Sequence, residues 1–462
     1  MTNFDWVSIL EAIPQNAEEP IVSEKFVKPL IEAFGFSSEE WRPQFQTDTG
    51  AVDFAARKNN GDDKFLISKE NPSLLIEVKG QANTNKTGAV KINLAEGTPQ
   101  YKSTKEQIER YLLSPNCKTA QWGIITNSNH IQLFRRHGRV VIPATISEFI
   151  TKDNITSVIA RIKKTIDSPP RALTVCLYND KGGVGKTTTT INLASVLWKQ
   201  KKKVLVVDFD GHQRDLSDAL GFQDGGVTFS ECFISDKVDI REAVKPFILK
   251  DKSGREVKLF DVIPSDKALE KITEKEKQAE IIDKSTRLRN LLQVFVNEYD
   301  YILIDSPPGW GFSSKSCVFA ADVVLMPTNH EDFGSIKNVP KVIKELIKEA
   351  QIIKREKYRE PLPIPLPIFF NKHDPTSASI TRTHLEIKRL ITVLGDKPFY
   401  DPELLPYYYP KAKKGDMNTD IFYVPAYKVV SSAAFSRVPA AMGNKNAFDY
   451  YLALAKEYFL YE

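Results

Sequence analysis

The chain has 462 residues, which is more than one ordinary hydrophobic core holds and predicts two domains. Its composition, 42% hydrophobic and 27% charged, fits a globular protein rather than a disordered one. A net charge of +5 permits nucleic-acid binding without arguing for it, and no apolar run is long enough to span a membrane. The four cysteines are scattered and the first residues lack a secretory signal, so we expect reduced thiols in a cytoplasmic protein.

Residues 1–168 predict a small mixed α/β domain. A polar, glycine-containing hairpin joins its first two expected strands. The expected elements are a helix over about 21–34, strands over about 50–57 and 73–79, a helix over about 99–113, and strands at QWGIITN and HIQLFRR.

Two acidic residues and a lysine lie on the first two strands. Asp53 is inside the first strand, whereas Glu77 and Lys79 are two residues apart on the second and point to one face. A carboxylate pair on adjacent strands can hold a hard cation such as Mg²⁺. A nearby lysine can orient the attacking water and stabilise charge on a phosphate. The alternative is an exposed salt bridge, which is what a lone Glu-x-Lys on a strand usually forms.

The two helices of this region could add polar groups to such a site. The first places Glu24 near the face of Val27 and Ile31, from which its carboxylate could reach the strands. The second puts Gln107 and Tyr111 four residues apart, on one helical face. Glu24, Gln107 and Tyr111 therefore join Asp53, Glu77 and Lys79 as candidate catalytic residues.

Over roughly residues 20–145 this arrangement resembles the PD-(D/E)xK nuclease fold, and in particular the amino-terminal domain of type I restriction-enzyme R subunits. The resemblance implies Mg²⁺-dependent cleavage of DNA, with Asp53 and Glu77 as the metal ligands. Double-stranded DNA is the partner we expect, and the sequence leaves single-stranded DNA open. The Pro-Asp of the family is Val-Asp here, a departure that leaves the metal ligand intact. The alternative is a degenerate fold that only binds DNA.

The boundary between the two domains is expected near Pro169. A helical pattern that includes Ile155 and Ile162 runs into SPP and stops there, and an apolar strand follows. The second domain would then cover residues 169–462. Its short, continuous apolar strands alternate with helices, which predicts a mostly parallel sheet flanked by helices. The strand-like runs are LTVCLYN, KKVLVVDFD, YDYILIDS, DVVLMPT and LPIFFNK.

The motif KGGVGKTT lies between the first strand and the first helix of this domain. Glycines allow the backbone to wrap a phosphate with its N–H groups, and the helix amino terminus adds a favourable dipole. Lys186 should reach the terminal phosphates, and Thr187 should supply a hydroxyl to Mg²⁺. The candidate phosphate-binding residues are Gly182, Gly183, Gly185, Lys186, Thr187 and Thr188.

From residue 173 onwards the chain resembles the ParA/MinD family of deviant Walker ATPases, on this loop with its extra Lys181 and on VLVVDFDGHQ and YDYILIDSPPG. The resemblance implies that the cofactors are ATP and Mg²⁺. It implies that Lys181 reaches the partner's phosphates in an ATP-dependent homodimer. It also implies that Asp210 serves in water activation and metal contact, and that Asp305 lies near Mg²⁺. The usual Asp-Pro-Gln is Asp-Gly-His-Gln here, a departure that bears on the rate of hydrolysis.

The segment FFNKHD places an Asn-Lys-x-Asp pattern after a strand, as many GTPases do to recognise guanine. ParA relatives place purine contacts at a similar point, so Asn371 is a candidate base contact whichever purine binds. The wider resemblance favours ATP and leaves GTP open.

We favour a DNA endonuclease whose assembly is controlled by nucleotide: ATP closes a dimer through Lys181 and brings two nuclease sites together, in restriction or another defence against foreign DNA. The alternative is a ParA-type partition or positioning ATPase. Its inactive nuclease fold would bind DNA or a partner, and a partner protein would stimulate hydrolysis. A third hypothesis is an ATP-dependent scaffold that touches no DNA. The last helix has no basic face, so we expect no membrane partner.

Overall fold

The computed structural model describes residues 4–85, 88–251, 253–272, 286–374, 379–395, 398–413, 415–430 and 437–461. The chain divides into two compact units. The first consists of Met1–Pro169 with Arg355–Pro361 and Tyr461–Glu462, and the second of Pro170–Lys354 with Leu362–Leu460. The first division falls between Pro169 and Pro170, and the two segments that return to the first unit have no signal in the sequence.

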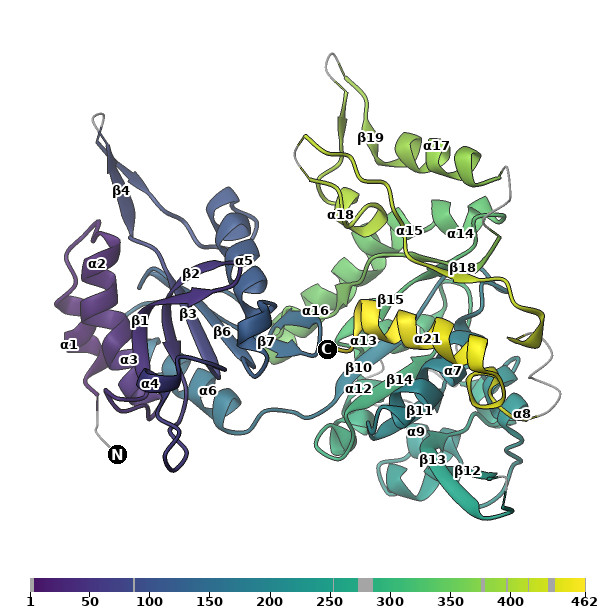
Figure 1. Ribbon diagram of the computed structural model, residues 1–462. Coiled ribbons are helices and arrows are strands. Elements are labelled where there is room, and N and C mark those ends of the chain that lie inside the picture. The colour runs from purple at the N-terminus through teal and green to yellow at the C-terminus, as the bar shows by residue number, and fades with distance from the viewer. Residues whose placement is uncertain are drawn as a thin grey trace. The chain divides into compact units, whose positions relative to one another are not determined.

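The first unit is a mixed sheet with helices on both faces (Figure 1). Its elements are α1 Trp6–Glu11, α2 Glu19–Val22, the π-helical turn Ser23–Val27, α3 Lys28–Ala33, β1 Trp41–Thr47, β2 Gly50–Ala56, α4 Phe65–Ser68, β3 Leu74–Val78, β4 Ala82–Asn85, β5 Gly88–Lys91, α5 Pro99–Leu112, the 3₁₀ turn Pro115–Cys117, β6 Trp122–Thr126, β7 His130–His137, β8 Val140–Pro143, β9 Glu148–Phe149 and α6 Ile155–Asp167.

The sheet of the first unit has the strand order β1-β2-β3-β6-β7-β8, with β9 also paired to β7. All pairs are antiparallel except β3 with β6. Helices α1 to α3 and α6 bury one face of the sheet, through a core that includes Phe26 and Ile76. Helices α4 and α5 bury the other face, through a core that includes Leu75 and Ile108. Because β3 is central, every one of its residues is buried, including Glu77.

The returning segments make specific polar contacts in the first unit. Glu148, of which only 5% is exposed, accepts hydrogen bonds from Arg161 (2.5 Å) and from Arg359 of the segment Arg355–Pro361 (2.6 Å). Tyr461 donates a hydrogen bond to the carbonyl of Leu113 at the end of α5 (3.0 Å). The first unit is therefore built from three stretches of chain.

The second unit is a larger α/β arrangement. Its elements are β10 Leu173–Leu177, α7 Lys186–Lys199, β11 Val204–Asp208, α8 Asp215–Leu220, α9 Phe229–Ile234, the 3₁₀ turn Ile240–Ala243, β12 Lys245–Lys250, β13 Glu256–Ile263, α10 Lys267–Lys271, α12 Arg287–Leu292, the 3₁₀ turn Gln293–Phe295, β14 Tyr301–Asp305, α13 Phe312–Ala320, β15 Val323–Leu325, β16 Pro327–Thr328, α14 Phe333–Lys337, α15 Val339–Lys341, the π-helical turn Val342–Ile347, α16 Lys348–Tyr358, β17 Ile364–Pro365, β18 Phe369–His373, α17 Ser379–Ile391, β19 Thr392–Val393, β20 Phe399–Tyr400, α18 Leu405–Tyr408, β21 Tyr423–Pro425, α20 Ala440–Gly443 and α21 Lys445–Tyr458.

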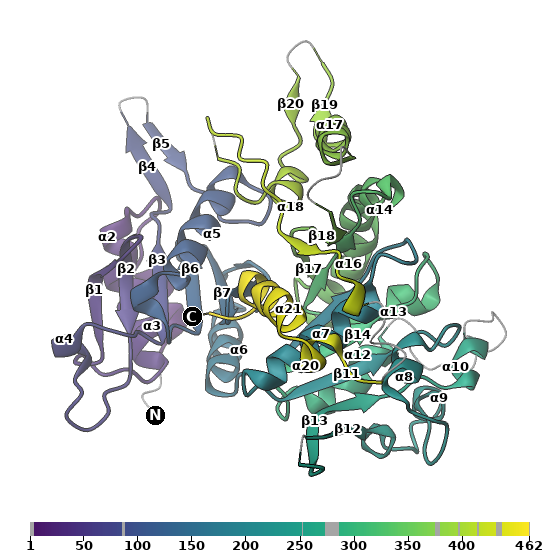
Figure 2. The same ribbon diagram turned by 45° about the vertical axis from the view of Figure 1, so that its right-hand side comes forward.

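The main sheet of the second unit has the order β12-β13-β11-β14-β10-β15-β17. Its pairs are parallel except β12 with β13. Strands β10, β11 and β14 are buried throughout, which is why their sequences are continuously apolar. Figure 2 shows α7 and α21 side by side over this sheet. The parallel, helix-flanked sheet expected from the sequence is confirmed.

The structure also differs from the expected elements in several places. The connection expected as a hairpin between β2 and β3 contains the helix α4. The helix expected over 21–34 is divided by the π-helical turn Ser23–Val27. Strand β1 was not expected, because Pro43 and its polar neighbours hide the alternation of an edge strand. The antiparallel β12–β13 hairpin was likewise not expected. No helix in the described part of the chain is both long and apolar enough to cross a membrane.

Candidate functional site

The loop between β10 and α7 has open space above its glycines. Gly183 and Gly185 have φ values of +75° and +91°, in the left-handed region that other residues rarely adopt. A β-carbon added at Gly182 or Gly183 would meet no protein atom within 4 Å. The backbone at the amino terminus of α7 therefore faces an open space, and this arrangement binds phosphate.

Lys186, the first residue of α7, turns back into this loop. Its ammonium donates hydrogen bonds to the carbonyl oxygens of Asn179 (3.2 Å) and Lys181 (3.1 Å), and 7% of the residue is exposed. Burial lowers the pKa of Lys186, while the carboxylates of Asp305 and Asp210 act in the opposite direction. A phosphate above the loop would stabilise the charged ammonium in the same way.

Thr187 and Asp305 are in direct contact beneath the loop. Thr187 Oγ1 donates a hydrogen bond to Asp305 Oδ2 (2.7 Å), and Thr190 Oγ1 donates one to Asp305 Oδ1 (3.4 Å). Burial, with the neighbouring Asp208, raises the pKa of Asp305. A hydroxyl and a carboxylate side by side are oxygen ligands that Mg²⁺ prefers. The residues at this site therefore fit a nucleotide phosphate and its magnesium ion.

Asp208, the last residue of β11, and Asp210, two residues later, have different contacts. Asp208 accepts hydrogen bonds from the backbone N–H of Asp210 (3.1 Å) and from Ser217 Oγ (2.6 Å), and burial raises its pKa to about 6. Asp210 Oδ1 accepts hydrogen bonds from the backbone N–H groups of His212 and Gln213, both at 3.1 Å. Asp210 thus orders the turn in which the sequence departs from Asp-Pro-Gln. Its roles in water activation and metal contact stay predictions.

Lys181, the extra lysine of the loop, is exposed. Its backbone N–H donates a hydrogen bond to Asn179 Oδ1 (3.0 Å). Its side chain crosses the first turn of α14, because a β-carbon added at Gly334 would lie 2.6 Å from Lys181 Cε. The approach of Lys181 to the phosphates of a second chain stays a prediction.

Asn371, the candidate base contact, lies within β18 and contacts the loop. Its Nδ2 donates hydrogen bonds to the carbonyl of Val184 (3.0 Å) and to Thr189 Oγ1 (3.4 Å). The next residue, Lys372, donates a hydrogen bond from Nζ to the carbonyl of Gly183 (2.9 Å). Lys372 was missed at the sequence level, where its only signal is its position beside Asn371.

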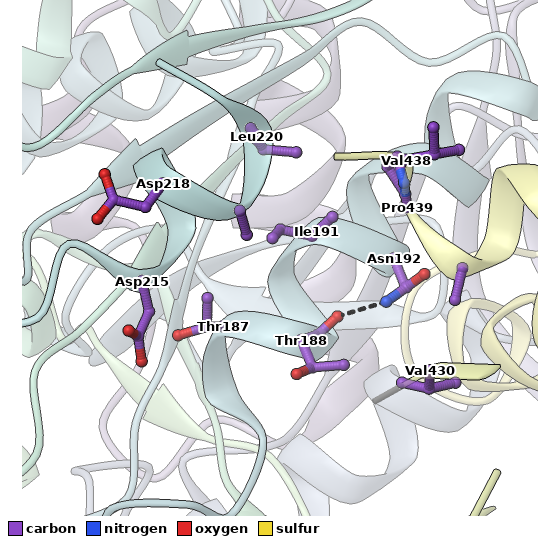
Figure 3. Close-up of a pocket in the computed structure, with 12 residues that line it drawn as sticks. Thr187, Thr188, Ile191, Asn192, Asp215, Asp218, Leu220, Val430, Val438 and Pro439 are labelled. Carbon is purple, nitrogen blue, oxygen red and sulfur yellow. Dashed lines mark hydrogen bonds between the residues drawn. The ribbon is translucent and has the colours of Figure 1, made fainter. Parts of the chain in front are cut away.

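A cavity of about 430 Å³ opens beside Thr187 and Thr188. Figure 3 shows that Ile191 and Leu220 form part of its apolar lining, while Asp215 contributes a carboxylate. This volume is in the range of small-molecule sites. Since the cavity begins where the phosphate loop ends, it could take the ribose and base of a nucleotide.

The first unit brings Asp53 and Glu77 together. Phe54 pairs with Ile76 in the antiparallel register of β2 and β3, so Asp53 lies opposite Glu77 at the next position. Directly opposite residues of an antiparallel pair point to the same side of the sheet. The two carboxylates are therefore neighbours, as the proposed metal site requires.

The two carboxylate oxygens of Glu77 have different surroundings. Oε1 accepts a hydrogen bond from Lys79 Nζ (2.5 Å), whereas Oε2 is buried and has no hydrogen-bond partner among the described residues. Burial raises the pKa of Glu77 to about 7, against the effect of Lys79 and with that of Asp53. A buried acceptor without a partner is costly, and a divalent cation would satisfy it.

Asp53 and Lys79 complete the central part of this site. Asp53 Oδ2 accepts a hydrogen bond from the backbone N–H of Val78 (2.7 Å), and Oδ1 accepts one from Gln44 Nε2 (3.0 Å). Burial acts to lower the pKa of Lys79, but the surrounding carboxylates, led by Glu77, outweigh it and raise the pKa. The positive charge of Lys79 is therefore held by the acidic groups around it.

The carboxylate of Glu19 lies near enough for its charge to act on Asp53, Glu77 and Lys79. Burial and the charge of Asp53 raise the pKa of Glu19, while Lys79 lowers it. Gly80 permits this approach, because a β-carbon added there would lie 3.0 Å from the backbone nitrogen of Glu19. The signals available in the sequence were Glu-Glu-Pro at a helix start and a glycine directly after Glu-Val-Lys.

The structure does not bring Glu24 into this group. Glu24 is exposed and forms an ion pair with Lys28, one turn further along the helix. Tyr111 is buried in the core, with its ring 3.1 Å from a β-carbon added at Gly50. Gln107 is half-buried, and no described hydrogen bond joins it to the carboxylates. The helical residues predicted for the site therefore contribute less than the strands.

No cluster of three or more His, Cys, Asp or Glu side chains suited to a metal ion occurs within the described ranges. A cation in the first unit would therefore depend on the carboxylates of Asp53 and Glu77, with its remaining positions taken by water or substrate oxygen.

Comparisons with known proteins concern the second unit most clearly. A family model described as an AAA domain matches residues 172–358. The chain is 35% identical over 165 residues to the chromosome partitioning protein ParA of Myxococcus xanthus, covering 35% of this chain and 53% of that protein. It is 31% identical over 233 residues to the chromosome-partitioning ATPase Soj of Treponema pallidum, covering 49% of this chain and 80% of that protein. The chain thus spans about half the length of the first of these relatives.

Among solved structures, apo McdA from Cyanothece is 20% identical, with a TM-score of 0.46, covering 62% of this chain and 98% of that one. The family model begins at residue 172, so the stretch Met1–Pro169 of the first unit lies outside its match.

Proposed function

Because the chain belongs to the ParA/Soj family of ATPases, we propose that its second unit binds and hydrolyses ATP with Mg²⁺ in order to partition or position a DNA cargo. The single observation that carries this proposal is the hydrogen bond between Thr187 and Asp305 (2.7 Å) beneath an open glycine loop. It places a hydroxyl and a carboxylate beside the amino terminus of α7, where phosphate would lie.

In this proposal each polar group of the loop has a distinct task. Lys186 would hold the terminal phosphates, and Thr187 with Asp305 would hold the cation. Bound Mg²⁺ would neutralise the charge that develops on the transferred phosphate. The described side-chain hydrogen bonds of Asp210 both end on Oδ1, so Oδ2 is the oxygen we assign to the attacking water.

We further propose that two chains dimerise on ATP through Lys181. Lys181 is exposed, and no ion pair in the described part of the chain involves its ammonium. The dimer would bind double-stranded DNA, and a partner protein would stimulate hydrolysis. The names of the two relatives, which refer to chromosome partitioning, support a DNA cargo.

Light scattering and hydrolysis assays on the full chain test this proposal. We expect the parent to be monomeric without nucleotide, dimeric with Mg-ATP, and a faster ATPase when duplex DNA is added. Lys181→Ala should bind ATP yet remain monomeric. Lys411→Ala, which removes an exposed lysine elsewhere in the second unit, is the matched control. A Lys181→Ala protein that dimerises normally would contradict the role given to this lysine.

The carboxylate site favours a second function for the first unit, a Mg²⁺-dependent DNA endonuclease. The observation behind it is the adjacency of Asp53, Glu77 and Lys79, with Glu77 Oε2 buried and unpartnered among the described residues. Asp53 and Glu77 would hold the cation, and Lys79 would orient water or stabilise the cleaved phosphate. ATP-driven dimerisation would then bring two such sites together for double-strand cleavage, as in restriction.

Cleavage of supercoiled plasmid tests this second function. The reaction should need Mg²⁺, respond to ATP, and be lost in Glu77→Gln. Glu24→Gln is the matched control, since Glu24 is an exposed acid on the neighbouring helix. Equal nicking by the parent and Glu77→Gln would point to a contaminant. No cutting by the parent with any divalent metal would leave the first unit as a binding module of the partition ATPase.

A further inference from the structure

Asn371 and Lys372, within β18, contact two consecutive backbone carbonyls of the phosphate loop. Asn371 binds the carbonyl of Val184 (3.0 Å), and Lys372 binds that of Gly183 (2.9 Å). The two donors are themselves linked, because the backbone N–H of Lys372 donates a hydrogen bond to Asn371 Oδ1 (3.0 Å). We call these two residues the loop clamp.

The geometry of the peptide bond links the direction of these carbonyls to the direction of the loop's N–H groups. In a trans peptide the C=O and the following N–H point in opposite directions. Since the carbonyls of Gly183 and Val184 point to the loop clamp, the N–H groups of Val184 and Gly185 point away from it. Those are backbone donors of the loop that would surround a phosphate.

The contacts of the loop clamp require unusual backbone conformations at two residues, Gly185 and Lys372. Gly185 has φ +91°, and a β-carbon there would lie 2.2 Å from Asn371 Nδ2, so only glycine leaves room for this amide. Lys372 has φ +53°, a left-handed conformation uncommon for a residue with a side chain. Such a conformation persists where surrounding contacts hold it, and here it directs the lysine across the loop.

The burial of Asn371 argues against its predicted role at the base. The residue is 3% exposed, and its amide nitrogen is already engaged by Val184 and Thr189. Releasing the amide to read a purine would leave the carbonyl of Val184 without this partner. The contacts of Asn371 therefore serve the phosphate loop.

We propose that Asn371 and Lys372 are positioning residues for the triphosphate: by holding two loop carbonyls outwards they preset the N–H groups that bind phosphate, and neither reads the base. This inference rests on the nucleotide site proposed above. It predicts that loss of the loop clamp weakens binding of any triphosphate by one common factor, whatever base is attached.

Calorimetric titration of the full chain with three Mg²⁺ complexes, those of ATP, GTP and inorganic tripolyphosphate, tests the proposal. Tripolyphosphate has no base, so it reports on the loop alone. Lys372→Gly removes the ammonium while accepting the left-handed backbone, and Asn371→Ala removes the amide. Each should weaken all three ligands about tenfold, the size expected for losing a hydrogen bond to a preset loop. Lys372→Arg, which can still donate to Gly183, should recover most of the loss, and Lys411→Ala should match the parent.

The outcomes separate the proposal from its premise. Loss confined to one purine nucleotide, with tripolyphosphate unaffected, would overturn it and return Asn371 to the base. Parent-like affinities in Lys372→Gly would overturn the part played by the lysine. A parent that binds none of the three ligands would overturn the nucleotide site itself. Melting temperatures measured without ligand identify a variant that fails to fold. If Asn371→Ala fails to fold, the comparison of Lys372→Gly with Lys372→Arg tests the proposal.

Discussion

In the second unit the cationic group of the site binds backbone carbonyls, whereas in the first unit the acidic groups lie against one another. Lys186 contacts the carbonyls of Asn179 and Lys181, and the loop around it is set by glycines. In the first unit Lys79 faces Glu77 and other carboxylates, one oxygen of which has no partner among the described residues. The arrangement in the second unit is suited to bind an anion, and that in the first unit is suited to bind a cation.

This difference explains why the two sites have different sequence signals. A site built from one loop leaves a contiguous motif, such as KGGVGKTT. A site built from strand register leaves only Asp53 and Glu77, residues whose meaning depends on which strands pair. The same difference also predicts how each site responds to mutation. Removing a group that binds a ligand, such as Lys186, should mainly impair function. Removing a group that balances buried charge, such as Lys79, should mainly lower the free energy of unfolding.

The largest effect is expected at Lys186. Lys186→Ala should reduce ATP hydrolysis by at least about a hundredfold, since electrostatic stabilisation of the transferred phosphate is lost. The melting temperature without nucleotide should change less than hydrolysis does, because the hydrogen bonds of the ammonium go to neutral carbonyls and only its longer-range attraction to Asp305 and Asp210 is lost. Steady-state phosphate release and calorimetry measure the two quantities. A large loss of stability with normal hydrolysis would reverse the comparison.

Lys79→Met should have the opposite profile. It removes the cation that faces Glu77 and Asp53, and should destabilise the first unit by about 3 kcal/mol at pH 8. Lys181→Met, at an exposed lysine of the other site, should leave stability unchanged. Hydrogen exchange at β3 reports the stability of the first unit. Equal protection in both variants would show that Lys79 does not balance the carboxylates.

The two units should also differ in how their stability depends on pH, because Glu77 of the first unit titrates near neutral pH. Its pKa is about 7 in the folded chain against the usual 4.5, so its favourable contribution is complete below pH 4.5 and is lost as the pH rises through 7. Between pH 5 and 8 the first unit should lose about 2 kcal/mol of stability, and Glu77→Gln should largely abolish this loss. Added Mg²⁺ should restore stability at pH 8 in the parent only. Parallel pH profiles for the two proteins would exclude Glu77 as the titrating group.

The smallest effect is expected at Gly334. A β-carbon there would displace the end of the Lys181 side chain, which is flexible, so Gly334→Ala should weaken ATP-dependent dimerisation only about threefold. Affinity of the monomer for ATP should not change. Light scattering across a concentration series measures the effect, with Gly395→Ala as an exposed control. Weaker ATP binding by the monomer would show that Gly334 acts on the loop itself.

The features that depend on local sequence pattern could be predicted from the sequence. The continuous apolar strands β10, β11 and β14 predicted the parallel sheet, and the alternation around Glu77 predicted the face on which its side chain lies. The contact of Thr187 with Asp305 follows from a motif and a strand end that parallel pairing brings together.

Features that depend on packing between residues far apart in the sequence could not be predicted from the sequence. Helical periodicity offered Glu24, but the close approach of α2 to Gly80 brings Glu19 to the carboxylate site. The Asn-Lys-x-Asp pattern suggested a base contact, yet the position of Asn371 is fixed by the missing β-carbon of Gly185, far away in the sequence. In both cases a glycine decides the outcome: Gly80 permits the backbone of Glu19 to approach, and Gly185 leaves room for the side-chain amide of Asn371.

The return of Arg355–Pro361 and Tyr461 to the first unit sets an order of events during synthesis. The strands that carry Asp53 and Glu77 leave the ribosome early, but Glu148 receives its second arginine only after residue 359 has been made. Tyr461 reaches Leu113 later still. A fragment ending at Pro169 would therefore carry the carboxylates without all of the framework around them. In nascent chains the first unit would stay incomplete until most of the second unit has been translated.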